Sequence, residues 1–102
     1  MQFRIFQLKS IADTDYAFRD WKCAKKHGFK LADYKKVYSG EREKKYILAN
    51  LWEEFNINHP ADFRGHSLSV SDLVALRDDG KDYWYWYYCD SFGWEEVTEI
   101  IN

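Results

Sequence analysis

The segment that most restricts the possible folds is a predicted β-hairpin in the last third of the chain. Residues 73–76 are consecutively apolar, which predicts a strand buried on both faces. Residues 83–89 are aromatic at nearly every position and predict the returning strand. Between them, Asp79-Gly80 is typical of a tight turn, because glycine adopts positive φ at no steric cost. The chain therefore needs a β-sheet with a thick aromatic core.

The amino-terminal third predicts a strand followed by a helix. Residues 2–8 favour a first strand, although their alternation of apolar and polar side chains is imperfect. A helix is expected to run through residues 16–26, with Asp13 or Thr14 as its cap. Its end is expected at His27-Gly28, since glycine takes the left-handed conformation that commonly terminates helices.

The middle of the chain repeats this order. Residues 34–38 predict a second strand, and the spacing of Ile47, Leu51 and Phe55 predicts one apolar helix face. This helix must end near residues 56–58, because the residue before Pro60 is excluded from the helical region. Residues 60–63 suit one more helical turn with Pro60 at its first position and Gly65 at its exit.

The predicted elements define the fold class. Residues 95–101 complete them as a short closing strand or helix. Their order predicts an α+β fold, with an antiparallel sheet of about four to five strands and two helices packed on it. Neither a repeat nor a linker interrupts the chain, so residues 1–102 are expected to form a single domain.

Two cysteines, Cys23 and Cys89, are fewer than a small secreted disulfide domain usually carries. The segment MQFRIFQLKS is too short and polar for a signal peptide, and no apolar run approaches the length of a membrane span. We therefore expect a cytoplasmic protein with reduced thiols.

Charge is distributed unevenly along the chain. Residues 1–45 contain 12 Lys or Arg and 6 acidic residues, a net charge of +6, whereas residues 46–102 contain 3 and 11, a net charge of −8. This asymmetry is compatible with a basic binding face. It is also compatible with two halves that attract each other within one fold, and we favour that interpretation.

The densest group of polar side chains lies in residues 56–72. A serine hydrolase would need a base beside the nucleophile and a frame such as G-x-S-x-G, which this segment lacks. His59, Asp62, His66 and Asp72 could supply metal ligands, but their spacing is not that of a zinc site. We expect no catalytic residue, no metal and no cofactor.

The same residues divide into structural and contact roles. Asp62, Asp72 and Asp90 lie at turns or strand ends, where carboxylates commonly accept backbone N–H bonds, so we expect them to be mainly structural. Turn tips carry binding residues disproportionately often. We therefore expect an exposed contact to be made by His59, Arg64 and His66.

The aromatic run 83–88 has two possible uses beyond the core. It could stack the bases of single-stranded nucleic acid, but such a surface needs cations, and along the chain only Lys81 lies nearby among four aspartates. A protein contact that includes Trp84 and Trp86 is therefore the favoured use. Lys22, Lys25 and Lys26 on the first helix leave nucleic-acid binding as the alternative.

Residues 55–74, beginning Phe55-Asn56-Ile57-Asn58-His59-Pro60 and continuing to Leu73-Val74, resemble the signature of the YodL-like domain family. The later Cys89-Asp90-Ser91-Phe92-Gly93-Trp94 is similar to the family's closing element, and residues 4–9 and 34–39 also fit. Cys89 departs from the pattern, since valine is common there, and residues 83–88 are more aromatic than usual. The resemblance covers nearly the whole chain, and its structural motif residues here are Pro60, Asp62, Gly65, Ser69, Ser71, Asp72, Asp90, Ser91 and Gly93.

The resemblance implies a function by association. Such domains occur alone or within large proteins of phages and conjugative elements of Gram-positive bacteria, and the resemblance implies no reaction. We therefore expect a non-enzymatic, protein-binding accessory or host-modulating module of a mobile genetic element. The alternative is a nucleic-acid-associated accessory domain that uses the basic amino-terminal half.

Overall fold

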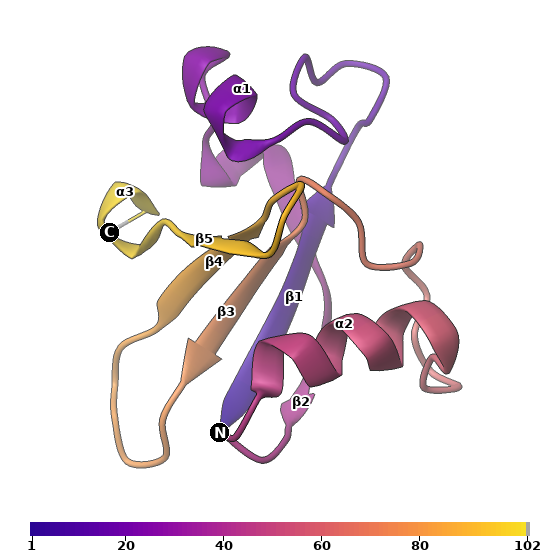
Figure 1. Cartoon of the computed structure of the whole chain (residues 1–102), viewed down its shortest axis with the longest axis vertical. Helices are drawn as coiled ribbons and strands as arrows, with labels where there is room; N and C mark the ends of the chain where they lie inside the picture. Colours follow the sequence, from indigo (N-terminus) through magenta and orange to yellow (C-terminus); the bar gives the residue numbers. More distant parts are fainter. Residues whose placement is uncertain (102) are drawn as a thin grey trace.

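The structure is a computed structural model, and it describes residues 1–101. Figure 1 shows one twisted antiparallel sheet with helices on both sides. Within these residues the elements follow one another as β1 (Gln2–Leu8), α1 (Trp21–Lys26), a 3₁₀ turn (Leu31–Asp33), β2 (Tyr34–Glu41), α2 (Ile47–Ile57), β3 (Leu73–Arg77), β4 (Tyr85–Cys89), β5 (Trp94–Glu96) and α3 (Thr98–Ile101). The α+β prediction is confirmed, and α3 is a third, short helix.

The sheet has the strand order β2-β1-β3-β4-β5 within the described residues. The predicted hairpin is formed by β3 and β4, in which Ala75 faces Trp86. The first strand, β1, lies between β2 and β3, so the amino-terminal strand pairs with a strand from the last third of the chain. A β-bulge near Val37 shifts the register of β2 against β1. Every neighbouring pair is antiparallel, as predicted.

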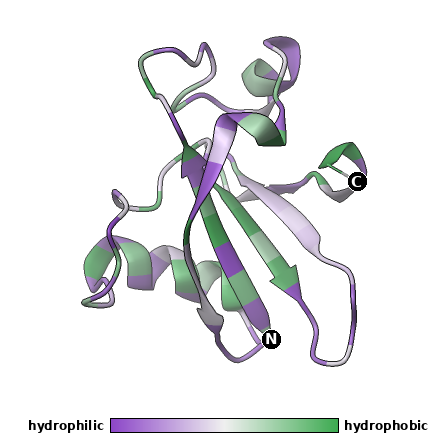
Figure 2. Cartoon of the chain, turned by 180° about the vertical axis from the view of Figure 1, so that it is seen from behind, coloured by the Kyte–Doolittle hydropathy of each residue, from purple (hydrophilic) through white to green (hydrophobic). Residues whose placement is uncertain are grey.

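The two faces of the sheet carry separate hydrophobic clusters. Successive side chains of a strand point to opposite faces, and in β3 both sets are buried. Val74 and Leu76 pack with α2 through Leu51 and Phe55, whereas Leu73 and Ala75 lie in the cluster that contains Trp21 and Ala24 of α1. Figure 2 shows hydrophobic residues concentrated on the two central strands. The prediction that residues 73–76 are buried on both faces is confirmed.

The first helix was predicted too long. α1 begins at Trp21 instead of residue 16, because Phe18 adopts a left-handed conformation with φ 61° that a helix cannot contain. Its cap is Asp20, whose Oδ1 accepts a 2.9 Å hydrogen bond from the Cys23 N–H, instead of Asp13 or Thr14. The predicted end is confirmed: Gly28 has φ 79°, and the Phe29 N–H donates to the Ala24 carbonyl.

The second helix agrees closely with its prediction. α2 ends at Ile57, and Ile47, Leu51 and Phe55 are its buried residues. After it, the Phe63 N–H donates to the Pro60 carbonyl, which closes a single tight turn where a helical turn was expected. β4 starts at Tyr85 instead of residue 83. The closing segment, predicted as a strand or a helix, contains both, β5 and α3.

Cys23 and Cys89 are free thiols and form no disulfide with each other. Among the helices of residues 1–101, none has the length and apolar character needed to cross a bilayer.

Candidate functional site

The polar motif of the sequence forms a buried network at the end of β1. Asp72 and Gln7 are each exposed by 2 % or less, although both are polar. Gln7 Nε2 donates to Asp72 Oδ2 at 3.0 Å and to the His66 carbonyl at 2.9 Å. The Ser69 N–H donates to the same Asp72 oxygen at 2.8 Å. The network therefore holds the loop after α2 against the first strand, which lies 59 to 65 residues earlier in the chain.

The carboxyl group of Asp72 has an unusual proton affinity. Burial raises the pKa of this carboxyl to about 7, against the opposing effects of the Ser69 N–H, the nearby His66 ring and the Gln7 amide. His66 Nδ1 lies 2.7 Å from the Ser67 carbonyl and 3.3 Å from Gln7 Nε2. His66 Nε2 faces Asp72 Oδ1 at 3.9 Å. Asp72 itself is too deeply buried to contact a substrate.

Ser71 connects the motif to the rest of the fold. It is buried and adopts φ 84°, a conformation that side chains other than glycine rarely take. Its Oγ accepts a bond from the Phe18 N–H at 3.0 Å, and its carbonyl accepts one from the Tyr34 hydroxyl at 2.6 Å. The Ser71 N–H donates to the Cys89 carbonyl at 2.9 Å. One strained residue thus joins the β1–α1 loop, β2 and β4.

The closing motif makes a second set of such bonds. Asp90 Oδ1 accepts the N–H of Trp21 at 3.0 Å and that of Ser91 at 2.8 Å. The Asp90 N–H donates to the Gly93 carbonyl at 2.9 Å, and Gly93 has φ 85°. Asp90 therefore holds both the β4–β5 turn and the first residue of α1.

Asp62 and Gly65 behave differently from these residues. Asp62 is exposed and accepts a 3.0 Å bond from the Tyr38 hydroxyl, where we expected backbone N–H donors. Gly65 leaves no space for a larger residue, because a Cβ there would collide with Gln7 Oε1 and lie 2.9 Å from the Phe63 ring. This close approach explains the glycine without any special backbone conformation.

The structure separates the four residues considered as metal ligands. His66 faces Asp72, whereas Asp62 contacts Tyr38 and the His59 ring packs edge-on to Phe63 at 5.3 Å. No three His, Cys, Asp or Glu side chains converge as metal ligands anywhere in residues 1–101.

The residues expected to make a contact lie on two surfaces. His59, Arg64 and His66 are exposed on the loop after α2, where Arg64 Nη1 donates to the Ala61 carbonyl at 2.9 Å. Trp86 lies in the core with its ring 5.0 Å from Phe6 and is only 8 % exposed, so it offers little surface.

Trp84 reaches the surface together with cations that sequence reasoning missed. The Arg4 guanidinium lies 4.2 Å from the centre of its ring, and the Arg77 guanidinium lies 4.9 Å away. Both arginines come from neighbouring strands, so proximity along the chain could not reveal them. The one signal in the sequence was the alternation of side chains along β1 and β3, which places Arg4 and Arg77 on the same face of the sheet.

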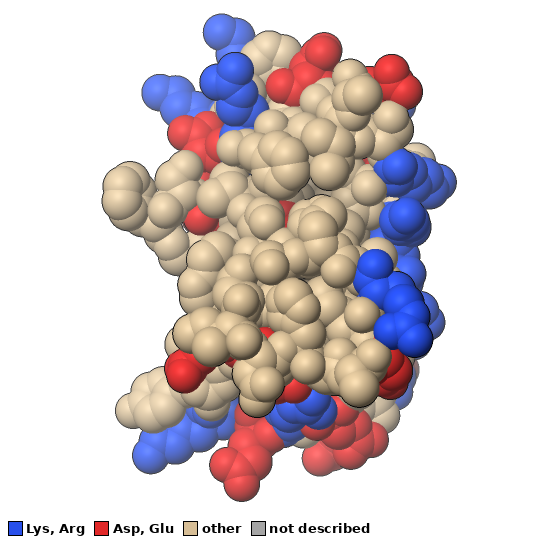
Figure 3. All heavy atoms as spheres, turned by 90° about the vertical axis from the view of Figure 1, so that its right-hand side faces the viewer, with Lys and Arg blue, Asp and Glu red and all other residues tan. Residues whose placement is uncertain are grey.

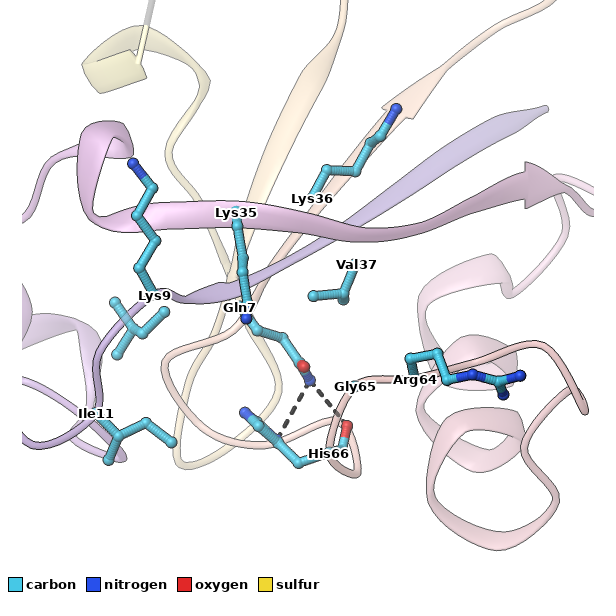
Figure 4. A pocket seen from close by; sticks show the side chains of 10 residues that line it. Gln7, Lys9, Ile11, Lys35, Lys36, Val37, Arg64, Gly65 and His66 are labelled. Atoms are coloured by element: carbon cyan, nitrogen blue, oxygen red, sulfur yellow. Dashed lines mark hydrogen bonds between the residues drawn. The ribbon is translucent and has the colours of Figure 1, made fainter.

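A cationic hollow lies beside the buried network (Figure 4). It has a volume of about 500 Å³. Gln7 lies at its floor, and the Lys35 side chain points inward toward Gln7, while those of Lys9 and Arg64 point away. Its charged or ionisable lining consists of Lys9, Lys35, Lys36, Arg64 and His66.

An apolar groove lies between α2 and the β4–β5 turn. Its volume is about 530 Å³, and its lining is Ala49, Trp52, Val70, Cys89, Asp90, Ser91, Gly93 and Trp94. Burial raises the pKa of the Cys89 thiol to about 12, so this group stays neutral. Phe92, between two lining residues, is 99 % exposed. In Figure 3 a broad surface without Lys, Arg, Asp or Glu covers the side of the molecule that carries α2.

The arrangement of these motifs can be compared with known families. The model of the YodL-like domain family matches residues 2–100. The chain belongs to this family. No curated protein and no solved structure matches it.

In this YodL-like domain, some motif residues hold the loops together and others lie at the surface of the apolar groove. Asp72, Ser71, Asp90 and Gly93 make bonds that hold loops together, and Gly65 permits close packing. Trp94 of the closing motif lines the apolar groove, and Phe92 lies exposed between the lining residues Ser91 and Gly93. The motif therefore shapes the two hollows that flank it, and these hollows are the candidate binding sites.

Proposed function

We propose that this YodL-like domain is a non-enzymatic protein-binding module, of the accessory or host-modulating kind that occurs in mobile genetic elements. The observation that carries the proposal is the apolar groove together with the exposed Phe92, which lies on the turn that contributes Ser91 and Gly93 to the lining. Covering an almost completely exposed phenylalanine with a partner would remove its apolar surface from water, which is favourable in free energy. Aromatic side chains of this kind are enriched among the residues that dominate protein interfaces.

The size and the lining of the groove support the proposal. Its volume lies within the range typical of ligand pockets, and aromatic or aliphatic side chains form much of its wall. Trp52 of α2 is 41 % exposed, and Trp94 of β5 is partly buried, so both rings can be contacted from outside. The turn that presents Phe92 is held by the Asp90 bonds to Trp21 and Ser91, so little ordering is required on binding.

Charge indicates the kind of partner. The groove is built entirely from residues 49–94, which belong to the acidic half of the chain, and Asp90 is its one charged lining residue. Electrostatic complementarity then favours a basic partner. We propose that the groove takes an extended segment of a protein that carries a large apolar side chain beside Lys or Arg.

Selection of peptides from a random display library, followed by titration of the purified domain, tests the proposal. Selected peptides should combine Leu, Phe or Trp with basic residues. The Phe92→Ser and Trp52→Ser variants should each bind at least about tenfold more weakly, as anchor residues do.

Ile57→Ser is the matched control, because Ile57 is 79 % exposed on α2 but does not line the groove. Its affinity for the selected peptides should equal that of the wild type. Equal losses in the Ile57→Ser and Phe92→Ser variants, or selection of acidic peptides without apolar anchors, would contradict the proposal.

A further inference from the structure

The sheet face opposite α2 is covered at only one end. α1 and Val97 pack at the end where Leu8, Tyr34 and Tyr88 lie. Figure 2 views this face and shows no helix in front of the lower half of the strands. Trp84 lies there with the Arg4 and Arg77 guanidinium groups 4.2 Å and 4.9 Å from its ring centre. This open half therefore presents a partly exposed aromatic ring in contact with two permanent cations.

The positive charge continues around the edge of the sheet. Lys36 of β2 lines a hollow with Arg4 and Trp84 and also lines the cationic hollow beside Gln7. The two hollows together with Arg77 bring six Lys and Arg residues into one track, namely Arg4, Lys9, Lys35, Lys36, Arg64 and Arg77. Figure 3 shows Lys and Arg side chains in a column along one edge of the molecule.

Few acids line the two hollows of this track. Glu41 is the one carboxylate among the residues that line the two hollows. Among the described residues, none of the six cations forms an ion pair, although other basic groups, such as Arg42 and Lys44, do. A concentration of unneutralised positive charge on a chain of net charge −2 therefore calls for an anionic ligand.

We propose that this track binds single-stranded nucleic acid, with a base on Trp84 and phosphates on the cations that lead around β2. Proteins that bind single strands combine a positive groove along the backbone with aromatic rings on which bases stack. A single strand can follow the path around the edge strand, whereas a stiff duplex bends only at a cost. This surface is distinct from the apolar groove and extends the proposed function.

Fluorescence anisotropy with a labelled 12-nucleotide oligothymidine or oligouridine, at low and moderate salt, tests the proposal. Lys36→Glu should weaken binding at least about tenfold and lessen the salt dependence, since each lost phosphate contact removes roughly 0.7 from the slope of log K against log salt. Trp84→Leu should weaken binding about tenfold through lost stacking. Lys25→Glu, a matched charge reversal on exposed α1, should bind as the wild type does.

Thermal unfolding of each variant shows whether it is folded. Because Trp84→Leu could disturb packing, an abasic oligonucleotide of equal length gives a second measurement of stacking with the wild-type protein. It should bind several times more weakly than oligothymidine. The proposal is overturned if no strand binds at low salt, if a duplex or polyglutamate binds as tightly as the strand, if the abasic strand binds equally well, or if Lys25→Glu and Lys36→Glu have the same effect.

Discussion

Asp72 shows how a single residue can be essential to a fold and still carry an energetic cost. Its carboxyl group accepts two hydrogen bonds that hold distant parts of the chain together. Burial nevertheless disfavours its ionised form, so its pKa is raised to about 7. An asparagine at this position could accept the same two bonds through one oxygen. The difference between the two residues is the ability to change charge near His66.

Asp72 should make stability depend on pH. Its usual pKa is about 4. Between about pH 4 and pH 7, therefore, the folded state binds more protons than the unfolded state. The free energy of unfolding should fall as the pH rises through this window, by about 1–4 kcal/mol from this residue. Asp72→Asn removes the effect, so chemical denaturation at pH 5 and pH 8 should show the variant gaining stability relative to the wild type as the pH rises.

Asp62→Asn is the control for this comparison, because it removes an aspartate that is exposed. A stability difference between wild type and Asp72→Asn that is the same at both pH values would show that Asp72 is already ionised at pH 5.

At the scale of elements, α2 provides an apolar connection between the loop motif and the sheet. Leu51 and Phe55 are completely buried against Phe3 and Ile5 of β1. The Phe55 ring also packs edge-on to Phe63 at 4.9 Å, which connects the helix to the loop that carries His59 and His66. Loss of packing in this helix should therefore loosen the loop as well as the core.

Leu51→Ala should lower the free energy of unfolding by about 2–5 kcal/mol, because it removes buried contacts and leaves a cavity. Glu53→Ala, two residues away on the exposed side of α2, should change it by less than about 0.5 kcal/mol. Denaturant unfolding followed by tryptophan fluorescence measures both. Equal effects in the two variants would contradict the assigned burial.

The hairpin and α2 could be predicted from the sequence more accurately than α1, for physical reasons. The hairpin and α2 were predicted because their apolar spacing and their flanking glycine and proline residues are local signals. α1 was extended too far, because its first turn depends on Asp20 and on the left-handed Phe18, whose N–H is held by Ser71 from 53 residues away. No local pattern reports that bond.

The candidate sites were predicted less completely than the fold. The dense motif drew attention to the right segment, yet Gln7, which completes its network, lies 65 residues from Asp72. The single lysine among four aspartates near the aromatic run argued against nucleic acid, but Arg4 and Arg77 reach Trp84 across the sheet. Strand order decides which charges meet, and the sequence alone did not reveal that β1 lies beside β3.

At the scale of the whole molecule, the basic and acidic halves attract each other across the fold. Arg42 pairs with Glu54 at 2.6 Å, Lys44 with Asp78 at 3.2 Å, and the amino terminus approaches Asp79 at 3.8 Å. Each pair joins residues 1–45 to residues 46–102. These contacts agree with the interpretation that the two halves attract each other within one fold. The cations of the track around β2 take no part in these pairs and can bind a ligand.

A double-mutant cycle can measure this attraction. Arg42 makes two hydrogen bonds to Glu54, from Nε at 3.0 Å and from Nη2 at 2.6 Å, whereas Lys44 is largely exposed. A bidentate pair with restricted side chains loses less entropy on forming than a flexible lysine pair. The Arg42→Gln and Glu54→Gln cycle should therefore give a coupling of about 0.5–1 kcal/mol at low salt that shrinks at 1 M salt. The Lys44→Gln and Asp78→Asn cycle should give less. A coupling for Arg42 and Glu54 that is absent at low salt would show that the halves associate through their shared apolar core alone.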